Sequence, residues 1–401
     1  MTDKKSTFKS SVVMSQKNTK LQASQLIPYI INLFGATFGV GSTGLPGAAT
    51  KVGILGFFIA SFFAVLSSYF ILTSLVTFSH ENNMTNFVDL YKMIGGKGVK
   101  VLVLTMFLLT NIGTLLFASS TFNSLLAKVA NYCDISIALL NAKSLFFMTI
   151  TILAMFYFSI KRKLDGLSWI TYVSFTTAIA VIFLLVLTVM NKHEYANHIN
   201  KNIIFDNAGL NGTFNLQYFA PAYLYMMFCL CIQPSYMDLY QAFPNKNPAK
   251  FKIITMLFLG VMSFVYVAYS MLGIYAFDLN KDAFMEGKQF LTLFTKYKDP
   301  FIIICNALMI FAAMACFLFN YKSTKENIGL IIFGDKYFRD KSDYNGINLS
   351  LTFVIVFGVT FVSGLFILQD INGLSIIGFV VNLICPIVFM MFPLFAFYKQ
   401  K

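Results

Sequence analysis

Charged residues are scarce in this sequence. Asp, Glu, Lys and Arg make up 12% of its 401 residues, whereas hydrophobic residues make up 57% and the mean hydropathy is +0.71. Ordinary soluble domains carry about twice this charged share. The composition therefore excludes a soluble globular protein and predicts an all-α polytopic membrane protein.

Acidic residues are rarer still, which leaves a formal net charge of +13. In a soluble protein this excess would suggest nucleic acid as a partner. Here the basic residues lie in short stretches between apolar segments, where they orient a membrane chain. We therefore expect a lipid bilayer around the protein and no nucleic acid.

Residues for metal binding and catalysis are also few. The three histidines lie at segment ends or in a loop, and Cys133 is the one cysteine of six outside the apolar segments. The sequence contains no CxxC, HExxH or GxSxG motif. It predicts no metal site, no cofactor, no disulfide framework and no enzymatic activity.

A polar tail precedes about ten apolar segments, most of them long enough to cross a bilayer. Residues 1–25 are predicted to form a cytoplasmic amino-terminal tail, and residues 26–398 a transmembrane domain of about ten helices. The segments lie at about 26–50, 53–79, 100–130, 144–160, 167–190, 217–243, 251–277, 300–321, 347–368 and 371–398.

Alternate loops between these segments are basic, which predicts the orientation of the chain. With the amino terminus in the cytoplasm, the inner loops contain Lys161 to Lys163, Lys322 and Lys325, and the glycosylation sequon at Asn211 faces outward. The sequence predicts an integral protein of the plasma membrane or of the vacuolar or lysosomal membrane.

The first apolar segment is interrupted by glycine. In the middle of residues 26–50, glycines lie at Gly35, Gly39, Gly41 and Gly44. Broken backbone survives in a membrane only where it lines a protein cavity, and its freed N–H and C=O groups could bind both ends of a small zwitterion. The alternative is a flexible helix whose glycines permit close packing.

Carriers built from two inverted repeats have a second interruption in the corresponding segment of the other half. Here that segment is 217–243, and Pro234 predicts a break or kink in it because proline removes a helix hydrogen bond. A kink that serves packing alone is the alternative.

Four stretches resemble the amino acid/auxin permease family, which includes sodium-coupled neutral and proton-assisted amino acid transporters. GVGSTGLPGAATKVG, from Gly39 to Gly53, resembles its first-helix pattern, and the stretch from Pro234 to Leu239 is similar to the P-x-Y-x-E-L close of its sixth helix. Residues 271–277 resemble its seventh helix, and Lys322 stands where the family usually has arginine.

The resemblance covers nearly the whole chain and implies a five-plus-five inverted-repeat transporter fold with broken helices 1 and 6. It implies alternating access around a central amino acid site. The chain departs from the family in two ways. It stops after the tenth segment, where relatives have an eleventh helix, and Cys229 stands where many neutral amino acid carriers have histidine.

The freed backbone predicts how an amino acid would bind. Amides of the half-helix that begins after Gly41 attract the carboxylate, and carbonyls at both interruptions accept from the ammonium group. The predicted substrate-binding residues are Thr37, Phe38, Gly39, Gly41, Ser42, Thr43, Gly44, Met227, Phe228 and Cys229.

Sodium ligands are missing where related carriers have them. Residues 301–319 contain no serine or threonine, so we expect transport that is proton-coupled or facilitative. Asp238, inside the sixth segment, is the coupling candidate. Its alternative role is that of a helix-end carboxylate paired with a basic inner loop.

Two other functions remain open. A channel would need a filter loop or rings of charge, which a glycine-broken helix pair fits less well. A sensor of the same fold that binds an amino acid without moving it would use the same site, so the sequence alone does not separate it from a carrier.

Overall fold

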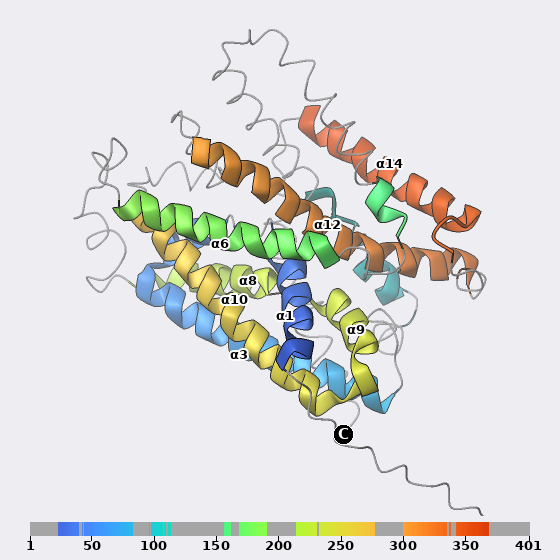
Figure 1. The fold of residues 1–401 in the computed structure, drawn as a ribbon, viewed down its shortest axis with the longest axis horizontal. Coiled ribbons are helices and arrows are strands. Elements are labelled where there is room, and N and C mark those ends of the chain that lie inside the picture. Colours follow the sequence, from blue (N-terminus) through green and yellow to red (C-terminus); the bar gives the residue numbers. More distant parts are fainter. Residues whose placement is uncertain are drawn as a thin grey trace, which may run out of the picture.

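The described part of the chain is helical. The computed structural model describes residues 23–39, 42, 44–82, 96, 98–106, 108–109, 111–113, 156–161, 168–190, 214–230, 232–276, 300–334, 337 and 342–368, and these contain no strand (Figure 1). The principal helices are α1 (Ala23–Thr37), α2 (Leu45–Val52), α3 (Ile54–Glu81), α6 (Ser168–Met190), α8 (Phe219–Cys229), α9 (Gln233–Ala242), α10 (Pro248–Ala276), α12 (Pro300–Phe333) and α14 (Gly346–Leu368).

Three helices in these ranges are long and apolar enough to cross a membrane. They are Ile54–Glu81, Trp169–Leu187 and Pro248–Gly273, with mean hydropathies of 2.2, 2.4 and 2.0. Shorter apolar helices include Leu26–Thr37 and Gly346–Val359. The expected total of about ten stays a prediction, because segment 371–398 and much of 100–160 lie outside the described residues.

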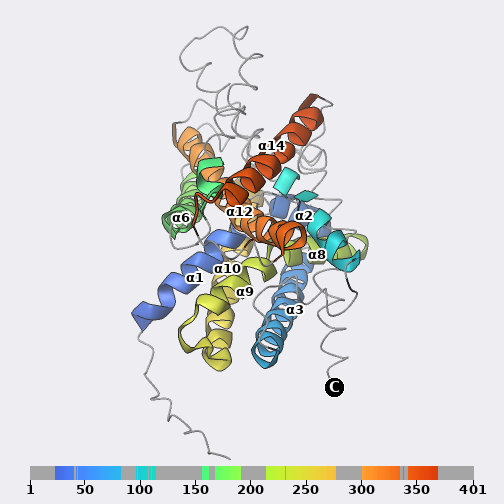
Figure 2. The ribbon, with the colours of Figure 1, turned by 90° about the vertical axis from the view of Figure 1, so that its right-hand side faces the viewer.

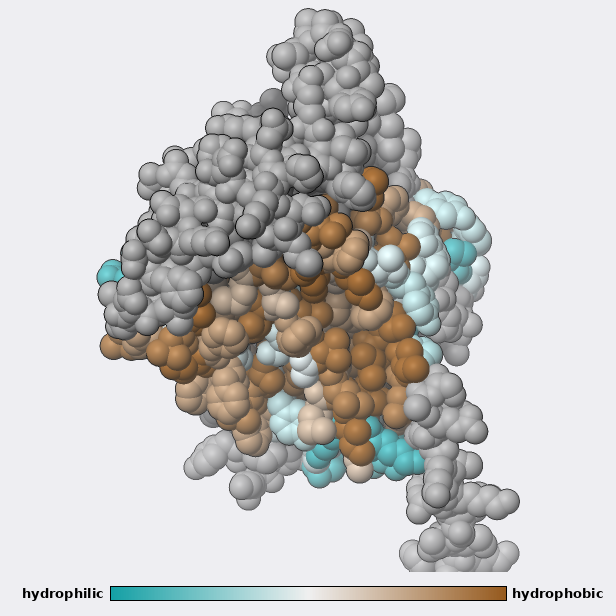
Figure 3. All heavy atoms as spheres, turned by 60° about the vertical axis from the view of Figure 1, so that its left-hand side comes forward, coloured by the Kyte–Doolittle hydropathy of each residue, from teal (hydrophilic) through white to brown (hydrophobic). Residues whose placement is uncertain are grey.

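Large apolar side chains point outward from these helices. On α3, Phe62 is 65% exposed and Phe70 58% exposed, and Phe264 on α10 is 75% exposed. Figure 3 shows apolar side chains covering most of the described surface on one face, with hydrophilic ones near its lower edge and along its right-hand side. Exposed apolar surface of this extent suits contact with lipid. The chain is an integral membrane protein.

The carboxyl-terminal half of helix α1 is buried in the bundle, at Leu33, Phe34, Ala36 and Thr37. The helix packs against α6, α10, α12 and α9, as Figure 2 shows for α9 and α10. One continuous core links α1, α2, α3, α6, α8, α9 and α10, and its fully buried aromatics include Phe34, Phe38, Tyr236, Tyr266 and Tyr269. The core therefore surrounds the segment in which the sequence places the first interruption.

Glycine separates α2 from α3. Gly53 has φ 84° and ψ 157°, a conformation that side chains penalise. Its N–H donates to the Ala49 carbonyl at 3.0 Å, and its own carbonyl accepts from the Phe57 N–H at 2.9 Å. The chain thus turns between the two helices while its backbone groups stay hydrogen-bonded.

The structure corrects the predicted end of the helix in the region of α12. This helix continues to Phe333, beyond the predicted end at 321, so Lys322 and Lys325 lie on a helix rather than in a loop. Lys325 is fully buried. Its ammonium group donates to the Ser159 carbonyl at 2.5 Å and to Thr352 Oγ1 at 3.4 Å. A buried charge needs such partners. The rule that basic residues gather in cytoplasmic loops does not predict them.

Candidate functional site at two interrupted helices

The first interruption separates α1 from α2. Helix α1 ends at Thr37 and α2 begins at Leu45. Between them, Ser42 donates to the Gly39 carbonyl twice, from its N–H at 3.1 Å and from its hydroxyl at 2.7 Å. Both donors of Ser42 are therefore hydrogen-bonded within the turn that contains this residue. Gly41 and Thr43, both predicted site residues, lie outside the described residues.

Gly44 lies at the start of α2 in close contact with α8. A Cβ built on Gly44 would be 2.0 Å from the hydroxyl oxygen of Tyr225. Side chains cannot approach so closely, so this position accepts glycine alone unless Tyr225 moves. Within the described residues no side chain caps α2. The first amides of a helix have no partner inside it and, with the positive end of the helix dipole, attract an anion.

The second interruption separates α8 from α9. Helix α8 ends at Cys229 and α9 begins at Gln233, with proline in its first turn. The Leu230 N–H still donates to the Met226 carbonyl at 3.1 Å, and the Tyr236 N–H donates to the Ile232 carbonyl at 2.7 Å. The pattern of helical backbone hydrogen bonds is thus interrupted over about one turn between α8 and α9.

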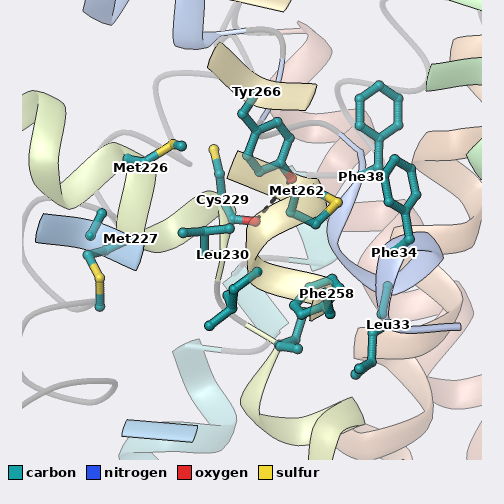
Figure 4. Close-up of a cluster of buried hydrophobic side chains, with 14 of the residues drawn as sticks. Leu33, Phe34, Phe38, Met226, Met227, Cys229, Leu230, Phe258, Met262 and Tyr266 are labelled. Atoms are coloured by element: carbon teal, nitrogen blue, oxygen red, sulfur yellow. Dashed lines mark hydrogen bonds between the residues drawn. The ribbon is translucent and has the colours of Figure 1, made fainter. Parts of the chain in front are cut away.

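Tyr266 of α10 joins the two interruptions. Its hydroxyl lies 3.0 Å from the Thr37 carbonyl oxygen and 3.1 Å from the Cys229 carbonyl oxygen. Figure 4 shows the Cys229 carbonyl directed at this hydroxyl. Thr37 and Cys229 are the last residues of α1 and α8, and the final carbonyls of a helix have no partner within it.

Ser174 of α6 contacts the same interruption from another side. Its hydroxyl donates to the Phe38 carbonyl at 3.2 Å. The ring of Phe38 stacks on Phe34 at 5.6 Å and on Tyr266 at 6.4 Å between centroids. Side chains of α6 and α10 therefore satisfy carbonyls that the sequence assigned to a ligand.

A polar cluster borders the same region. The Tyr225 hydroxyl is buried and has no hydrogen-bond partner in the described part of the chain, and its electrostatic neighbours are Cys229 and Tyr269. Burying a hydroxyl without a partner costs about 1–3 kcal/mol. The Tyr225 hydroxyl lies beside the start of α2 and could donate a hydrogen bond to a ligand there.

Asp238, the coupling candidate, lies on α9 and pairs with a lysine of α12. Its carboxylate is 3.7 Å from the ammonium group of Lys322, which is also 3.9 Å from Glu326. The basic partner is therefore on a helix, not in the inner loop that the alternative reading named. The described residues hold no group of three His, Cys, Asp or Glu suited to a metal.

The predicted site residues differ in where they lie. The carbonyls of Thr37 and Cys229 meet at Tyr266, and Phe38, Gly39, Ser42 and Gly44 follow in the first interruption. Met227 and Phe228 lie on α8, but the sulfur of Met227 accepts from Ser68 of α3 at 3.3 Å. Its side chain therefore faces α3. Sequence reasoning missed Tyr266, Ser174 and Tyr225, which carry no local motif.

The fold of the chain is similar to that of a solved transporter structure. The chain resembles a Na⁺-coupled sialic acid symporter in a substrate-bound outward-open state, with a TM-score of 0.57, 14% identity, and coverage of 89% of this chain and 76% of that one. At this identity the likeness shows the fold alone. A manganese transporter of Eremococcus coleocola, solved with an aromatic bis-isothiourea substituted compound, matches with a TM-score of 0.44 and 10% identity over 93% of this chain and 77% of that one, too weakly to support an argument. No curated protein matches the chain.

A family model settles the identity that the sequence suggested. The model described as transmembrane amino acid transporter protein matches residues 24–401. This range includes both interruptions and every helix from α2 onward. The chain belongs to the transmembrane amino acid transporter family.

Proposed function

We propose that the protein carries amino acids across a membrane by alternating access, as a secondary active or facilitative transporter. The two interrupted helix pairs, α1 with α2 and α8 with α9, correspond to broken helices 1 and 6 of a five-plus-five inverted repeat. The observation that supports this most is the meeting of two helix-end carbonyls, from Thr37 and Cys229, at one hydroxyl in the core.

The backbone groups suit an α-amino acid. Carbonyls of Thr37, Phe38 and Cys229 would accept from its ammonium group, and amides near Gly41 to Gly44 would bind its carboxylate. The Tyr225 hydroxyl lies next to Gly44 and has no hydrogen-bond partner among the described residues, so it would donate a further hydrogen bond to that carboxylate.

We propose that this transport does not require sodium. The apolar stretch 301–319 lies on α12 and offers no side-chain hydroxyl to a cation. Asp238 is the acid through which a proton could act, and its pairing with Lys322 ties the half-helix α9 to α12. The amino terminus would face the cytoplasm, in a plasma membrane or a vacuolar or lysosomal membrane.

A sensor that binds an amino acid without net transport remains the second candidate, because it would use the same carbonyls and amides. Uptake of radiolabelled amino acids into proteoliposomes separates the two functions. We expect accumulation with sodium replaced by choline, measured at two external pH values. Strict dependence on sodium would refute the coupling proposal, and binding without accumulation would identify a sensor.

A further inference from the structure

The position of Tyr266 suggests a role beyond packing. Its side chain is fully buried in α10, and its hydroxyl contacts the carbonyl of Thr37, 229 residues away in the chain, and that of Cys229, 37 residues away. The ring stacks on Phe38 with planes 20° apart. Tyr266 is thus fixed at the point where both interruptions begin.

The two bonds share one proton. A tyrosine hydroxyl has a single hydrogen to donate, whereas both carbonyl oxygens lie within bonding distance of it. An ammonium group has three N–H donors and a positive charge, and charge-assisted hydrogen bonds are about twice as strong as neutral ones. An ammonium group at this position would serve both carbonyls better than the hydroxyl does.

We propose that the Tyr266 hydroxyl stands in for the ammonium group of the substrate when the site is empty. Without it, the carbonyls of Thr37 and Cys229 would each lose a hydrogen bond in the core, away from water. With it, the empty carrier keeps both interruptions joined as the loaded carrier does. The arriving amino group then displaces the hydroxyl. This inference rests on the proposed amino acid transport.

The presence of the Tyr266 hydroxyl at the ammonium position of the empty carrier has a kinetic consequence. Net uptake needs the empty carrier to return across the membrane, whereas exchange moves a loaded carrier in both directions. Tyr266 supports only the empty form, so losing its hydroxyl slows the return step and spares exchange. The same loss removes a competitor for the carbonyls, so the substrate binds more tightly.

Purified full-length protein and its Tyr266→Phe variant test this inference in proteoliposomes. The probe is the amino acid that binds wild-type protein best among the twenty common ones. We expect its Kd to fall about threefold to tenfold in the variant, which is the effect of one net hydrogen bond. Net uptake should fall while exchange stays within about twofold of wild type, since only the loaded carrier takes part in exchange.

Tyr236→Phe is the matched control. The Tyr236 hydroxyl is equally buried, and it bonds the Thr255 hydroxyl at 2.6 Å rather than a carbonyl of either interruption. This variant also loses one buried hydroxyl bond. We expect it to leave both the Kd and the ratio of net uptake to exchange unchanged.

Difluorotyrosine at position 266 provides a second test that keeps the ring and the hydroxyl. Fluorine makes the hydroxyl a stronger donor, so we expect weaker substrate binding, opposite in sign to Tyr266→Phe. Weaker binding in Tyr266→Phe, or a parallel loss of net uptake and exchange, would overturn the placeholder role. If wild-type protein binds no amino acid, the proposed function itself fails and this inference fails with it.

Discussion

The two interruptions are produced by different residues. Between α1 and α2 the break is rich in glycine, whereas the short break between α8 and α9 is followed by proline in the first turn of α9. Side chains of other helices pack closely against glycines at and just before the first interruption. Tyr225 packs against Gly44, and Thr171 packs against Gly35 near the end of α1, where a Cβ would lie 2.5 Å from that of the threonine.

This difference predicts different sensitivities to substitution. At the first interruption, glycine is required because another helix occupies the space of a side chain. At the second, proline acts through the backbone, by removing one N–H and restricting the preceding residue. Added volume should therefore be far more harmful at the first interruption than loss of proline is at the second.

The largest effect is expected at Gly44. In Gly44→Ala the new methyl group meets the Tyr225 hydroxyl at 2.0 Å, and overpacking of this kind costs about 1–3 kcal/mol. We expect uptake to fall about tenfold or more. The matched control is Gly260→Ala on α10, whose Cβ would have no neighbour within 4 Å. Equal uptake in the two variants would show that Gly44 is not part of the substrate site.

The charge pair of α9 is expected to have the next largest effect. In Asp238→Asn we expect accumulation at steady state to fall several-fold and lose its pH dependence, while exchange changes less than about twofold, because an acid within a span is a candidate proton carrier. The control exchanges the two charges, with Asp238→Lys and Lys322→Asp together. Normal accumulation in that double variant would show that the pair is structural.

A smaller effect is expected at the second interruption. Pro234→Ala restores an N–H and permits α8 to continue toward α9. We expect uptake to fall only about two- to threefold, because the alanine removes a constraint without filling space. Loss of uptake as complete as in Gly44→Ala would contradict the contrast drawn between the two interruptions.

The smallest effect is expected from the unpartnered hydroxyl. Tyr225→Phe removes a buried donor that has no bond in the described part of the chain. We expect a higher melting temperature for the substrate-free protein and a Kd about twofold weaker, because the hydroxyl bonds only when substrate is present. An unchanged Kd would show that it contacts no substrate.

Local chemistry explains what the sequence could predict. Glycine and proline act on their own backbone, so runs such as GVGSTGLP and the position of Pro234 are visible without a structure. Length and hydropathy identify membrane helices such as α3 and α10 in the same way.

Contacts between distant residues explain what it could not predict. Tyr266 is one of 20 tyrosines, and its importance comes from carbonyls on two other helices. Its charge alone predicts a loop position for Lys325, yet its partners Ser159 and Thr352 are separated from it by 166 and 27 residues. Tertiary packing decided both positions.

Recognition of both ends of an amino acid is the central claim, and competition binding tests it most directly. Purified protein is loaded with its best-bound radiolabelled amino acid and challenged with the unlabelled compound, its N-acetyl derivative and its methyl ester. In the binding mode that we propose, helix-end carbonyls bind the ammonium group and α2 amides bind the carboxylate, so we predict that neither derivative competes. Competition by either derivative at the concentration of the parent amino acid would contradict the account.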